Sequence, residues 1–295
     1  MSFDTPILFL IFNRIDTSKK VFNKIRDIRP SRLYISSDGP RNDLEKNKIK
    51  NLRDYLQSSI DWDCKVETLF RDENLGCKMA VSSAINWFFE NEEMGIILED
   101  DCLPSTSFFY YCGELLNKYK EDERIFLISG HNSQEKWLGG KGDYFFSHFG
   151  GIWGWASWRR AWNNYDIEAK DLNEFIDNDG FRKLLGNKLG KIRQKEIYEH
   201  LVIRKANTWA YQWAYTRLKN GGLACVPRLN LIENIGFDVS ATHTTELIGN
   251  HVMSFELTFP LSENDMFVPE KEYDLKFISS PSIYKRIFHY VKRRF

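Results

Sequence analysis

The chain has 295 residues, 42% of them hydrophobic, which is enough to bury a core in one large or two small domains. Lys plus Arg and Asp plus Glu each number 41. The net charge of zero excludes a global field that would attract nucleic acid or another polyanion. We therefore expect a globular protein whose charge effects are local.

The five cysteines are odd in number and form neither a CxxC pair nor a zinc-ligand spacing. This usage favours a reduced, cytosolic setting. No apolar stretch approaches the roughly 20 residues of a membrane-spanning helix, and the N-terminus lacks the layout of a signal peptide. We expect a cytoplasmic protein.

The first half of the chain alternates apolar runs with helical segments. Strands are predicted at residues 6–12, 32–37, 65–70, 96–98 and 124–132, and helices at 17–28, 77–93 and 105–122. Strands that alternate with helices predict a parallel sheet flanked by helices, which is an α/β fold.

From Trp137 onward the chain becomes rich in tryptophan and irregular, as in "FGGIWGWASWRRAW" and "NTWAYQWAYTRLKNGG". We interpret this part as a substrate-shaping region built onto the sheet. No linker separates the two parts, so the sequence predicts one compact unit.

The C-terminal segment is basic, because no acidic residue follows Asp274 whereas six Lys and Arg residues do. In "SIYKRIFHYVKRRF" apolar residues recur at helical spacing. A basic amphipathic helix of this kind can lie on an anionic membrane. The alternative is a terminal helix that docks on the domain with a solvated basic face, and both interpretations stay open.

Polar side chains follow four predicted strands. They are Asn13 and Arg14, Asp38, Arg71 and Asp72, and the triplet Glu99, Asp100 and Asp101 in "GIILEDDCLPS". The carboxyl ends of parallel strands meet at one edge, where open α/β sheets bind ligands. Carboxylates can hold a divalent ion, and an arginine can pair with phosphate. Together they predict a nucleotide diphosphate site, although each residue taken alone is more often a turn or cap residue.

Neither GxGxxG nor GxxxxGK[ST] occurs, and the GxSxG elbow is also missing. A metal ion and side chains would therefore have to bind the phosphates.

The stretches "TPILFLIFNR", "YISSDGPR", "FRDENLG" and "IILEDDC" resemble, in this order and spacing, bacterial nucleotide-diphospho-sugar transferases of the GT-A superfamily. They are more distantly similar to the N-acetylglucosaminyltransferase I family. The resemblance extends over about residues 5–245 and includes "SGHN", "GGIWGWASW" and "NTWAYQW". It implies a GT-A-type, mostly parallel sheet with an irregular Trp-rich region on the acceptor side.

The resemblance also implies residue roles. Asn13, Arg14 and Asp38 would hold the nucleobase, uracil being expected. Asp101 would bind Mn²⁺ or Mg²⁺ bridging the diphosphate, while Glu99 and Asp100 would contact ribose and the donor sugar. Arg71 and Lys78 are further candidates for the diphosphate charge, which a divalent ion would also stabilise.

An inverting transferase needs a general base for the acceptor hydroxyl. In the resembling proteins a Trp-Asp pair supplies it, but here the matching position holds Ala210, which cannot accept a proton. Three explanations are open. The chain is an inactive variant made to trap substrates, or it is an inactive or altered natural homologue. The third explanation is that the alignment to the resembling proteins is in the wrong register at this position. In the last two cases Asp238, Glu233 or Asp166 would be the base.

Four further side chains are candidates for contacts. Trp209 and Trp153 could stack on a sugar, although the aromatic face around Trp209 could equally well only pack. His243 in "ATHT" could complete the metal ligands, although a lone histidine is more often structural. His131 in "SGHN" is a weaker candidate at the same edge.

The sequence thus predicts a metal-dependent, inverting glycosyltransferase that moves a sugar from a nucleotide-diphosphate donor, expected to be a UDP-sugar, to a bacterial surface glycan or glycoconjugate. Residues 1–125 would form the nucleotide-sugar-binding half, 126–270 the acceptor-binding half and 271–295 the basic tail, which could contact the inner membrane surface. The alternatives are a homologue that binds sugar nucleotide or glycan without turnover, and a sugar nucleotidylyltransferase. The latter would want a Gly-rich loop after the first strand, and "FNRIDTSKK" has no glycine.

Overall fold

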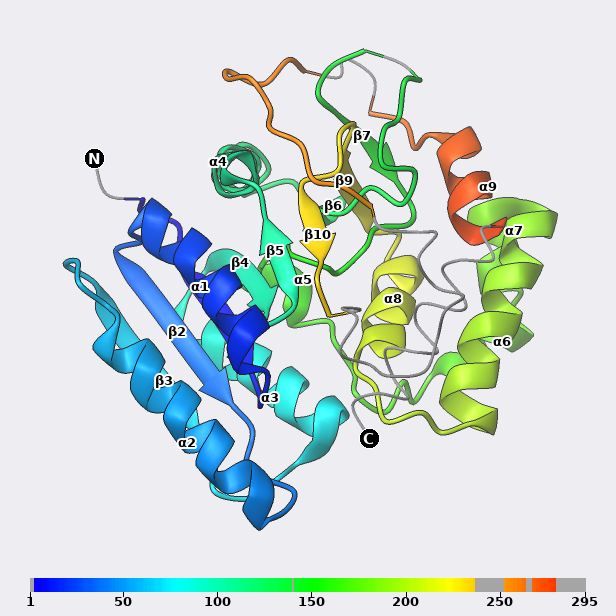
Figure 1. The fold of residues 1–295 in the computed structure, drawn as a ribbon. Coiled ribbons are helices and arrows are strands. Elements are labelled where there is room, and N and C mark those ends of the chain that lie inside the picture. The colour runs from blue at the N-terminus through cyan, green and yellow to red at the C-terminus, as the bar shows by residue number, and fades with distance from the viewer. Residues whose placement is uncertain (1–2, 140, 237–251, 264–266, 280–295) are drawn as a thin grey trace, which may run out of the picture.

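The computed structural model describes residues 3–139, 141–236, 252–263 and 267–279. An eight-stranded sheet runs through the molecule in the order β3-β2-β1-β4-β8-β6-β9-β7, and β5 and β10 form a separate pair (Figure 1). The strands are β1 (Ile7–Ile11), β2 (Arg32–Ser37), β3 (Lys65–Phe70), β4 (Met94–Glu99), β5 (Cys102–Pro104), β6 (Ile125–Ser129), β7 (Tyr144–Ser147), β8 (Trp155–Trp158), β9 (Leu223–Pro227) and β10 (Ile232–Asn234).

The helices are α1 (Ile15–Ile28), α2 (Asp43–Ser58), α3 (Gly76–Asn91), α4 (Thr106–Lys118), α5 (Arg159–Trp162), α6 (Leu172–Asp177), α7 (Gly180–Tyr198), the π-helical η1 (Glu199–Ile203), α8 (Ala210–Lys219) and α9 (Lys271–Ser279).

The sheet is mostly parallel. Strands β1 to β4 run parallel to one another, and β8 is antiparallel to both β4 and β6. Strand β9 is parallel to β6, and β7 is antiparallel to β9. The carboxyl ends of β1, β2, β3, β4, β6 and β9 therefore lie at the same edge. The predicted α/β class with a mostly parallel sheet is confirmed.

Helices cover both faces of the sheet, which explains why β1, "ILFLI", is apolar throughout. On one face α1, α2 and α4 pack against alternate strand residues such as Phe9 and Leu98. On the other face α3, α5 and α8 pack against Leu8, Leu10 and Ile97. Figure 1 shows α1 and α2 along the β2–β3 side of the sheet. The alternation of strands and helices in the first half thus produces a three-layer core.

The Trp-rich region is an aromatic cluster on the second face. The rings of Trp155, Trp162 and Trp213 are mutual neighbours: the Trp213 centroid lies 5.9 Å from Trp155 and 5.0 Å from Trp162, which are 6.2 Å apart. Trp209 stacks on Trp155 at 5.8 Å. The region is more regular than its sequence predicts, because it contains β7 to β10 and α5 to α8. The large rings obscure the periodic pattern, since indoles fill core positions in short strands and helices alike.

A third cluster lies where α6, α7 and α8 meet, and it includes Phe181, Ile197 and Tyr215. Helix α7 contains a break at Gly186, whose φ of 77° and ψ of 171° are not helical. Helix α9 contacts both α7 and β7.

Strands from both sides of residue 125 enter the one large sheet, and the proposed division into halves stays a prediction. Within the described ranges no helix has the length and apolarity needed to cross a membrane. The predicted basic C-terminal helix, residues 282–295, lies outside the described residues, and α9 ends before it.

Candidate functional site

Arg14 and two carboxylates of the triplet lie together near the middle of the eight-stranded sheet. Strands β1 and β4 are hydrogen-bonded neighbours, so the residues that follow them share the same edge. Arg14 Nη1 donates a short hydrogen bond to Asp101 Oδ2 and lies 3.7 Å from Asp100 Oδ1. The backbone N–H of Phe12 donates to Asp100 Oδ2 at 3.0 Å. The structure therefore brings together three residues that the sequence assigned to one site.

The triplet is buried. Glu99, Asp100 and Asp101 are each 1% exposed, which excludes the solvated turn that a run of carboxylates often forms. A buried carboxylate is costly without compensating charge or donors, so the Arg14 guanidinium is part of what keeps these side chains in place.

The segment after β10 packs against Asp101 and Arg14. The N–H of Ile235 donates to the backbone oxygen of Asp101 at 2.8 Å. A Cβ at Gly236 would lie 2.6 Å from Asp101 Oδ2 and 3.1 Å from Arg14 Nη1, so a larger residue there would displace these side chains. Gly236 was not predicted, although a glycine two residues after the end of a strand can mark a close approach of the backbone. Glu233 lies in β10, opposite Leu103 of β5.

Asn13 takes part in a second network at the start of α2. Its Nδ2 donates to Glu45 Oε1 at 2.8 Å, and Glu45 also accepts hydrogen bonds from Arg41. The bond from Arg41 lowers the pKa of Glu45. Neither Arg41 nor Glu45 was predicted, because an Arg and a Glu four residues apart are a common surface pair on any helix.

Asp38 holds the loop between β3 and α3. Its Oδ1 accepts from the N–H groups of Gly39 and Leu75, and its Oδ2 accepts from Gly76 N and Asn74 Nδ2, at 2.9 to 3.1 Å. Burial raises the pKa of Asp38, although these backbone bonds act in the opposite direction. A carboxylate has about four acceptor positions, so all of them are occupied. This geometry favours the cap interpretation over a nucleobase contact.

Arg71 and Lys78 lie on either side of this loop. Arg71 donates to Ser83 Oγ at 2.8 Å and to Ser36 Oγ at 3.3 Å, and burial lowers its pKa. The Nζ of Lys78 forms an ion pair with Glu168 at 3.0 Å, and its backbone N–H donates to Asn207 Oδ1 at 3.0 Å. Asn207 was not singled out from the sequence.

Ala210 is the first residue of α8 and is partly buried. Its N–H donates to Thr208 Oγ1 at 3.2 Å. Through Asn207 the chain just before it contacts the first turn of α3 at the carboxyl edge. Of the alternative bases, Asp166 accepts the N–H groups of Glu168 and Lys170, both at 2.9 Å, as a turn residue does.

The two tryptophans have different surroundings. Trp209 is 1% exposed and stacks on Trp155, which favours the packing interpretation over contact with a sugar. Trp153 is partly exposed and lies 4.7 Å from the ring of His131 at the end of β6. Because β8 is antiparallel, its amino end puts Trp153 at the same edge as the triplet.

Asp238 and His243 lie outside the described residues. Among the described residues no group of three His, Cys, Asp or Glu side chains is arranged to hold a metal ion. Protein-bound Mg²⁺ often has only one or two carboxylate ligands and takes the others from phosphate and water. Asp101 and Asp100 fit that pattern, provided that Arg14 gives up its bond to Asp101.

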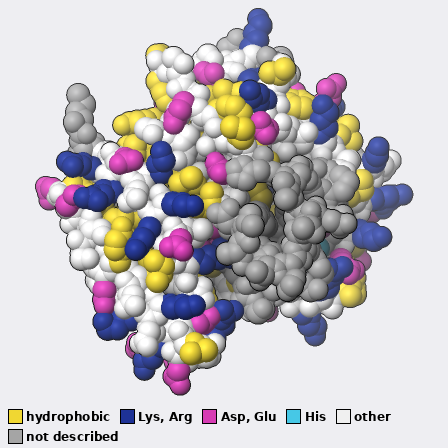
Figure 2. Space-filling view, in the orientation of Figure 1, with side chains coloured by type: hydrophobic (Ala, Val, Ile, Leu, Met, Phe, Trp, Pro, Cys, Tyr) yellow, Lys and Arg dark blue, Asp and Glu magenta, His cyan; other side chains and the backbone are white. Residues whose placement is uncertain are grey.

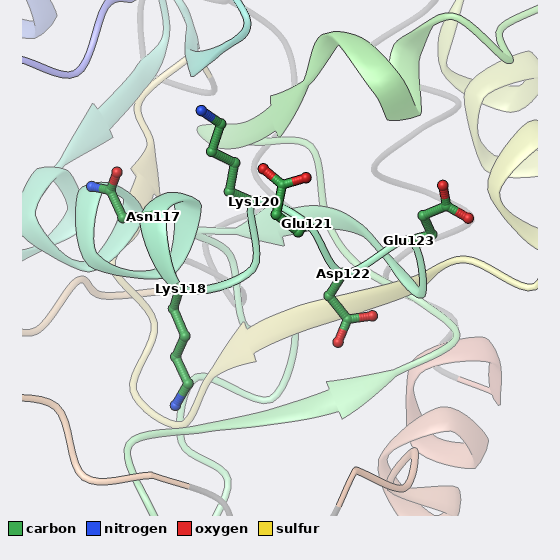
Figure 3. A pocket seen from close by; sticks show the side chains of 6 residues that line it. All are labelled: Asn117, Lys118, Lys120, Glu121, Asp122 and Glu123. Carbon is green, nitrogen blue, oxygen red and sulfur yellow. The ribbon is translucent and has the colours of Figure 1, made fainter.

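A hollow of about 710 Å³ lies at the turn between α4 and β6, and Figure 3 shows the charged side chains that line it. It precedes β6 and so lies at the edge opposite the triplet. Three of its charges are paired, namely Lys118 with Glu263, Lys120 with Glu93 and Asp122 with Arg124. Because three of its five charged side chains are already paired, we assign no ligand to this surface turn.

No family model matches the sequence, and no curated protein matches it. Several solved structures are distantly similar in fold. A UDP-glucose pyrophosphorylase in complex with UDP-glucose is 10% identical with a TM-score of 0.39, over 78% of this chain and 94% of that one. HddC from Yersinia pseudotuberculosis is 12% identical with a TM-score of 0.32, over 53% of this chain and 77% of that one.

The 4-diphosphocytidyl-2C-methyl-D-erythritol synthase from Anaerococcus prevotii is 9% identical with a TM-score of 0.33, over 59% of this chain and 84% of that one. At these TM-scores the similarities carry no argument about activity or ligand, and the names describe those proteins alone.

Proposed function

We propose that this protein is a glycosyltransferase that moves a sugar from a nucleotide-diphosphate donor, a UDP-sugar in our expectation, to a hydroxyl group of a glycan or glycoconjugate. The observation that carries the proposal is the meeting of Arg14 with the buried Asp100 and Asp101 at the carboxyl ends of β1 and β4. Open α/β sheets bind ligands at this edge, and a cation beside carboxylates suits a diphosphate with its metal ion.

The proposed metal ion is Mn²⁺ or Mg²⁺. Asp101 would hold it, with Asp100 and Glu99 nearby and phosphate oxygens completing the coordination. When bound, the ion would stabilise the negative charge that develops on the leaving nucleoside diphosphate. Arg14, once released from Asp101, would be free to pair with a phosphate.

The nucleobase would lie near Asn13, whose Nδ2 is engaged with Glu45 and whose amide oxygen remains an acceptor for a base N–H. Asp38 supports this proposal less directly, because its acceptor positions hold the β3–α3 loop. Arg71 and Lys78 are the cations that this loop brings toward the same edge.

The proposed transfer also needs a general base, which Ala210 cannot provide. Ala210 begins α8 just after Asn207, which contacts α3 at the carboxyl edge, so an acidic side chain there would lie on the acceptor side of the donor. We propose that position 210 is where the base belongs in an active form. The present chain would then bind the donor without efficient transfer.

Two measurements test this proposal. Isothermal titration with UDP should show binding that requires Mn²⁺ and that is lost in Asp101→Asn. Ala210→Asp should then produce transfer, or hydrolysis of the donor, with a panel of UDP-sugars, whereas Ala214→Asp one helical turn further should not. An inert Ala210→Asp variant that still binds UDP would show that the base lies elsewhere.

Sugar nucleotidyl transfer is tested with the same protein. Incubation with UTP and a sugar 1-phosphate would release pyrophosphate if the chain were a nucleotidylyltransferase. The connection from β1 to α1 argues against it, because it consists of Phe12, Asn13 and Arg14 and contains no glycine to wrap a triphosphate. Release of pyrophosphate would replace our proposal with this alternative.

A further inference from the structure

Helix α7 consists of two half-helices that fold against each other. Gly186 interrupts the helix, and Gly190 in the second half packs against the first half. A Cβ at Gly190 would lie 2.6 Å from the carbonyl oxygen of Phe181 and 2.7 Å from Cα of Arg182, so only glycine allows this approach. The break therefore brings side chains of both halves to one place.

A hollow of about 370 Å³ lies where the half-helices meet. Its lining residues are Asp179, Arg182, Lys191, Gln194, Lys195 and Tyr198. The last four lie at positions i, i+3, i+4 and i+7 and so share one face of the second half-helix. Arg182 comes from the first half, and its ion pair with Asp179 fixes it at the rim.

The charge of this hollow is positive. Three cations, Arg182, Lys191 and Lys195, line it against one anion, Asp179, which pairs with Arg182. Figure 2 shows dark blue Lys and Arg side chains gathered at the margin where Figure 1 places α7. Lys191 and Lys195 are both exposed, and within the described residues neither ammonium group takes part in an ion pair.

These features suit one kind of ligand. A phosphate group accepts hydrogen bonds from a guanidinium fork and from ammonium groups together, and a dianion benefits from several cations around one hollow. Tyr198 is 38% exposed at the end of the same face and offers a hydroxyl group and a ring, and Gln194 adds an amide. An aromatic ring beside a cationic cluster suits a phosphate attached to a larger organic group.

We infer that the hollow on α7 is a binding site for a phosphate group carried by an organic ligand, such as a phosphorylated saccharide or a lipid headgroup. This inference does not rest on the proposed transferase activity, because the hollow and the carboxyl edge use different residues.

The test uses pyrophosphate as the first probe, measured by isothermal titration at low ionic strength. The double variant Lys191→Gln/Lys195→Gln should bind it roughly tenfold more weakly, as expected for the loss of two partly exposed charges beside a dianion. The matched control is Lys46→Gln/Lys48→Gln, which removes two exposed lysines from α2. Circular dichroism confirms that both variants are folded.

Two further arms identify the source of the phosphate. Glucose 1-phosphate stands for a soluble saccharide phosphate, and vesicles of phosphatidylcholine with or without phosphatidate stand for a lipid headgroup. Weaker binding of a probe by the α7 variant alone supports the site. The probe whose binding is weakened, the saccharide phosphate or the phosphatidate vesicle, identifies the source of the phosphate. Equal binding by all three proteins, no binding of any probe, or an equal loss in the α2 control would overturn the inference.

Discussion

At the scale of single residues, charge compensation dominates the candidate site. Asp101 has a side chain that is 2% exposed and Arg14 one that is 27% exposed, so the pair lies at the border between core and solvent. Removing one member of a buried pair leaves a charge that water cannot reach. The same carboxylate could bind a metal ion only by releasing the guanidinium. Arg14 and a divalent cation should therefore compete for Asp101.

This competition predicts the behaviour of Arg14→Gln. Without metal, the variant should lose about 2–3 kcal/mol of unfolding free energy, because Asp101 stays buried beside Asp100 without its cation. Mn²⁺ should restore about 2–3 kcal/mol at a hundredfold excess over its dissociation constant. Urea unfolding in EDTA and in Mn²⁺ measures both effects.

Arg26→Gln serves as the control, since its ion pair with Asp61 is exposed and should contribute little to stability. Equal responses of the wild type and Arg14→Gln to Mn²⁺ would show that Asp101 is not where the metal binds.

A second residue, Arg217 of α8, has an unusual environment. It is 2% exposed, and its Nε and Nη1 have no hydrogen-bond partner in the described part of the chain. Burial, together with the smaller effect of the like charge of Arg193, lowers the pKa of Arg217 to about 9. A buried guanidinium with two nitrogens that lack a hydrogen-bond partner opposes folding.

Arg217→Met should therefore raise the free energy of unfolding at pH 7 by about 1–3 kcal/mol. The folded-state pKa lies below that of the unfolded chain, so the wild type regains stability as the pH rises above about 9. The gain from the substitution should shrink between pH 9 and pH 11. Unfolding of both proteins in guanidinium chloride across this pH range measures the difference in stability. If Arg217→Met were less stable than the wild type at pH 7, the expectation would be contradicted.

At the scale of elements, the connections between strands and helices decide what the site can do. The β1–α1 connection brings Arg14 to the carboxylates, and Asp38 keeps the β3–α3 loop in place by capping the first residues of α3. In α7, Gly186 determines where the helix breaks, because its backbone conformation is one that other residues rarely adopt.

Gly186→Ala tests the importance of this break. No atom would lie within 4 Å of the added Cβ, so any effect comes from the backbone conformation and not from a clash. We expect a loss of about 1–3 kcal/mol of unfolding free energy, together with weaker pyrophosphate binding at the α7 hollow. Lys183→Ala on the same helix is exposed and should change stability by less than about 0.5 kcal/mol. An unchanged stability in Gly186→Ala would mean that α7 straightens without cost.

At the scale of the whole molecule, the sequence predicts the first half well and the second half poorly. Apolar runs such as "ILFLI" are long and uninterrupted, and each precedes a periodic helix, so strands and their direction follow from local pattern. The meeting of Arg14 with Asp101 across 87 residues follows from the parallel direction of β1 and β4.

The second half depends on contacts that no local pattern reveals. Strand β8 inserts antiparallel between β4 and β6, and Trp209 turns into the core although its neighbourhood would equally suit a ligand surface. Asp38 could not be assigned from sequence, since a capping carboxylate and a base-binding one look alike until their donors are known. The roles of the site residues stay predictions.

One long-range contact ties residues 252–263 to the first half of the chain. Glu256 accepts hydrogen bonds from the N–H groups of Thr106 and Ser107, at 2.9 and 2.7 Å, at the start of α4. Burial acts to raise the pKa of Glu256, but the bonds from Ser107 and Thr106 outweigh it and lower the pKa. A carboxylate at this position also favours the helix dipole.

Glu256→Gln should lower the free energy of unfolding by about 1 kcal/mol at pH 7, the usual contribution of a helix cap. Because the folded-state pKa is depressed, the wild type holds this stability above the ordinary glutamate pKa and loses it as the pH falls below about 4. The two proteins should therefore converge in acid when unfolding is followed from pH 7 to pH 3. Glu263→Gln, whose exposed carboxylate pairs with Lys118, should have a smaller effect at neutral pH. A difference for Glu256→Gln that persists unchanged at pH 3 would mean that the shape of the side chain, and not its charge, holds this segment on α4.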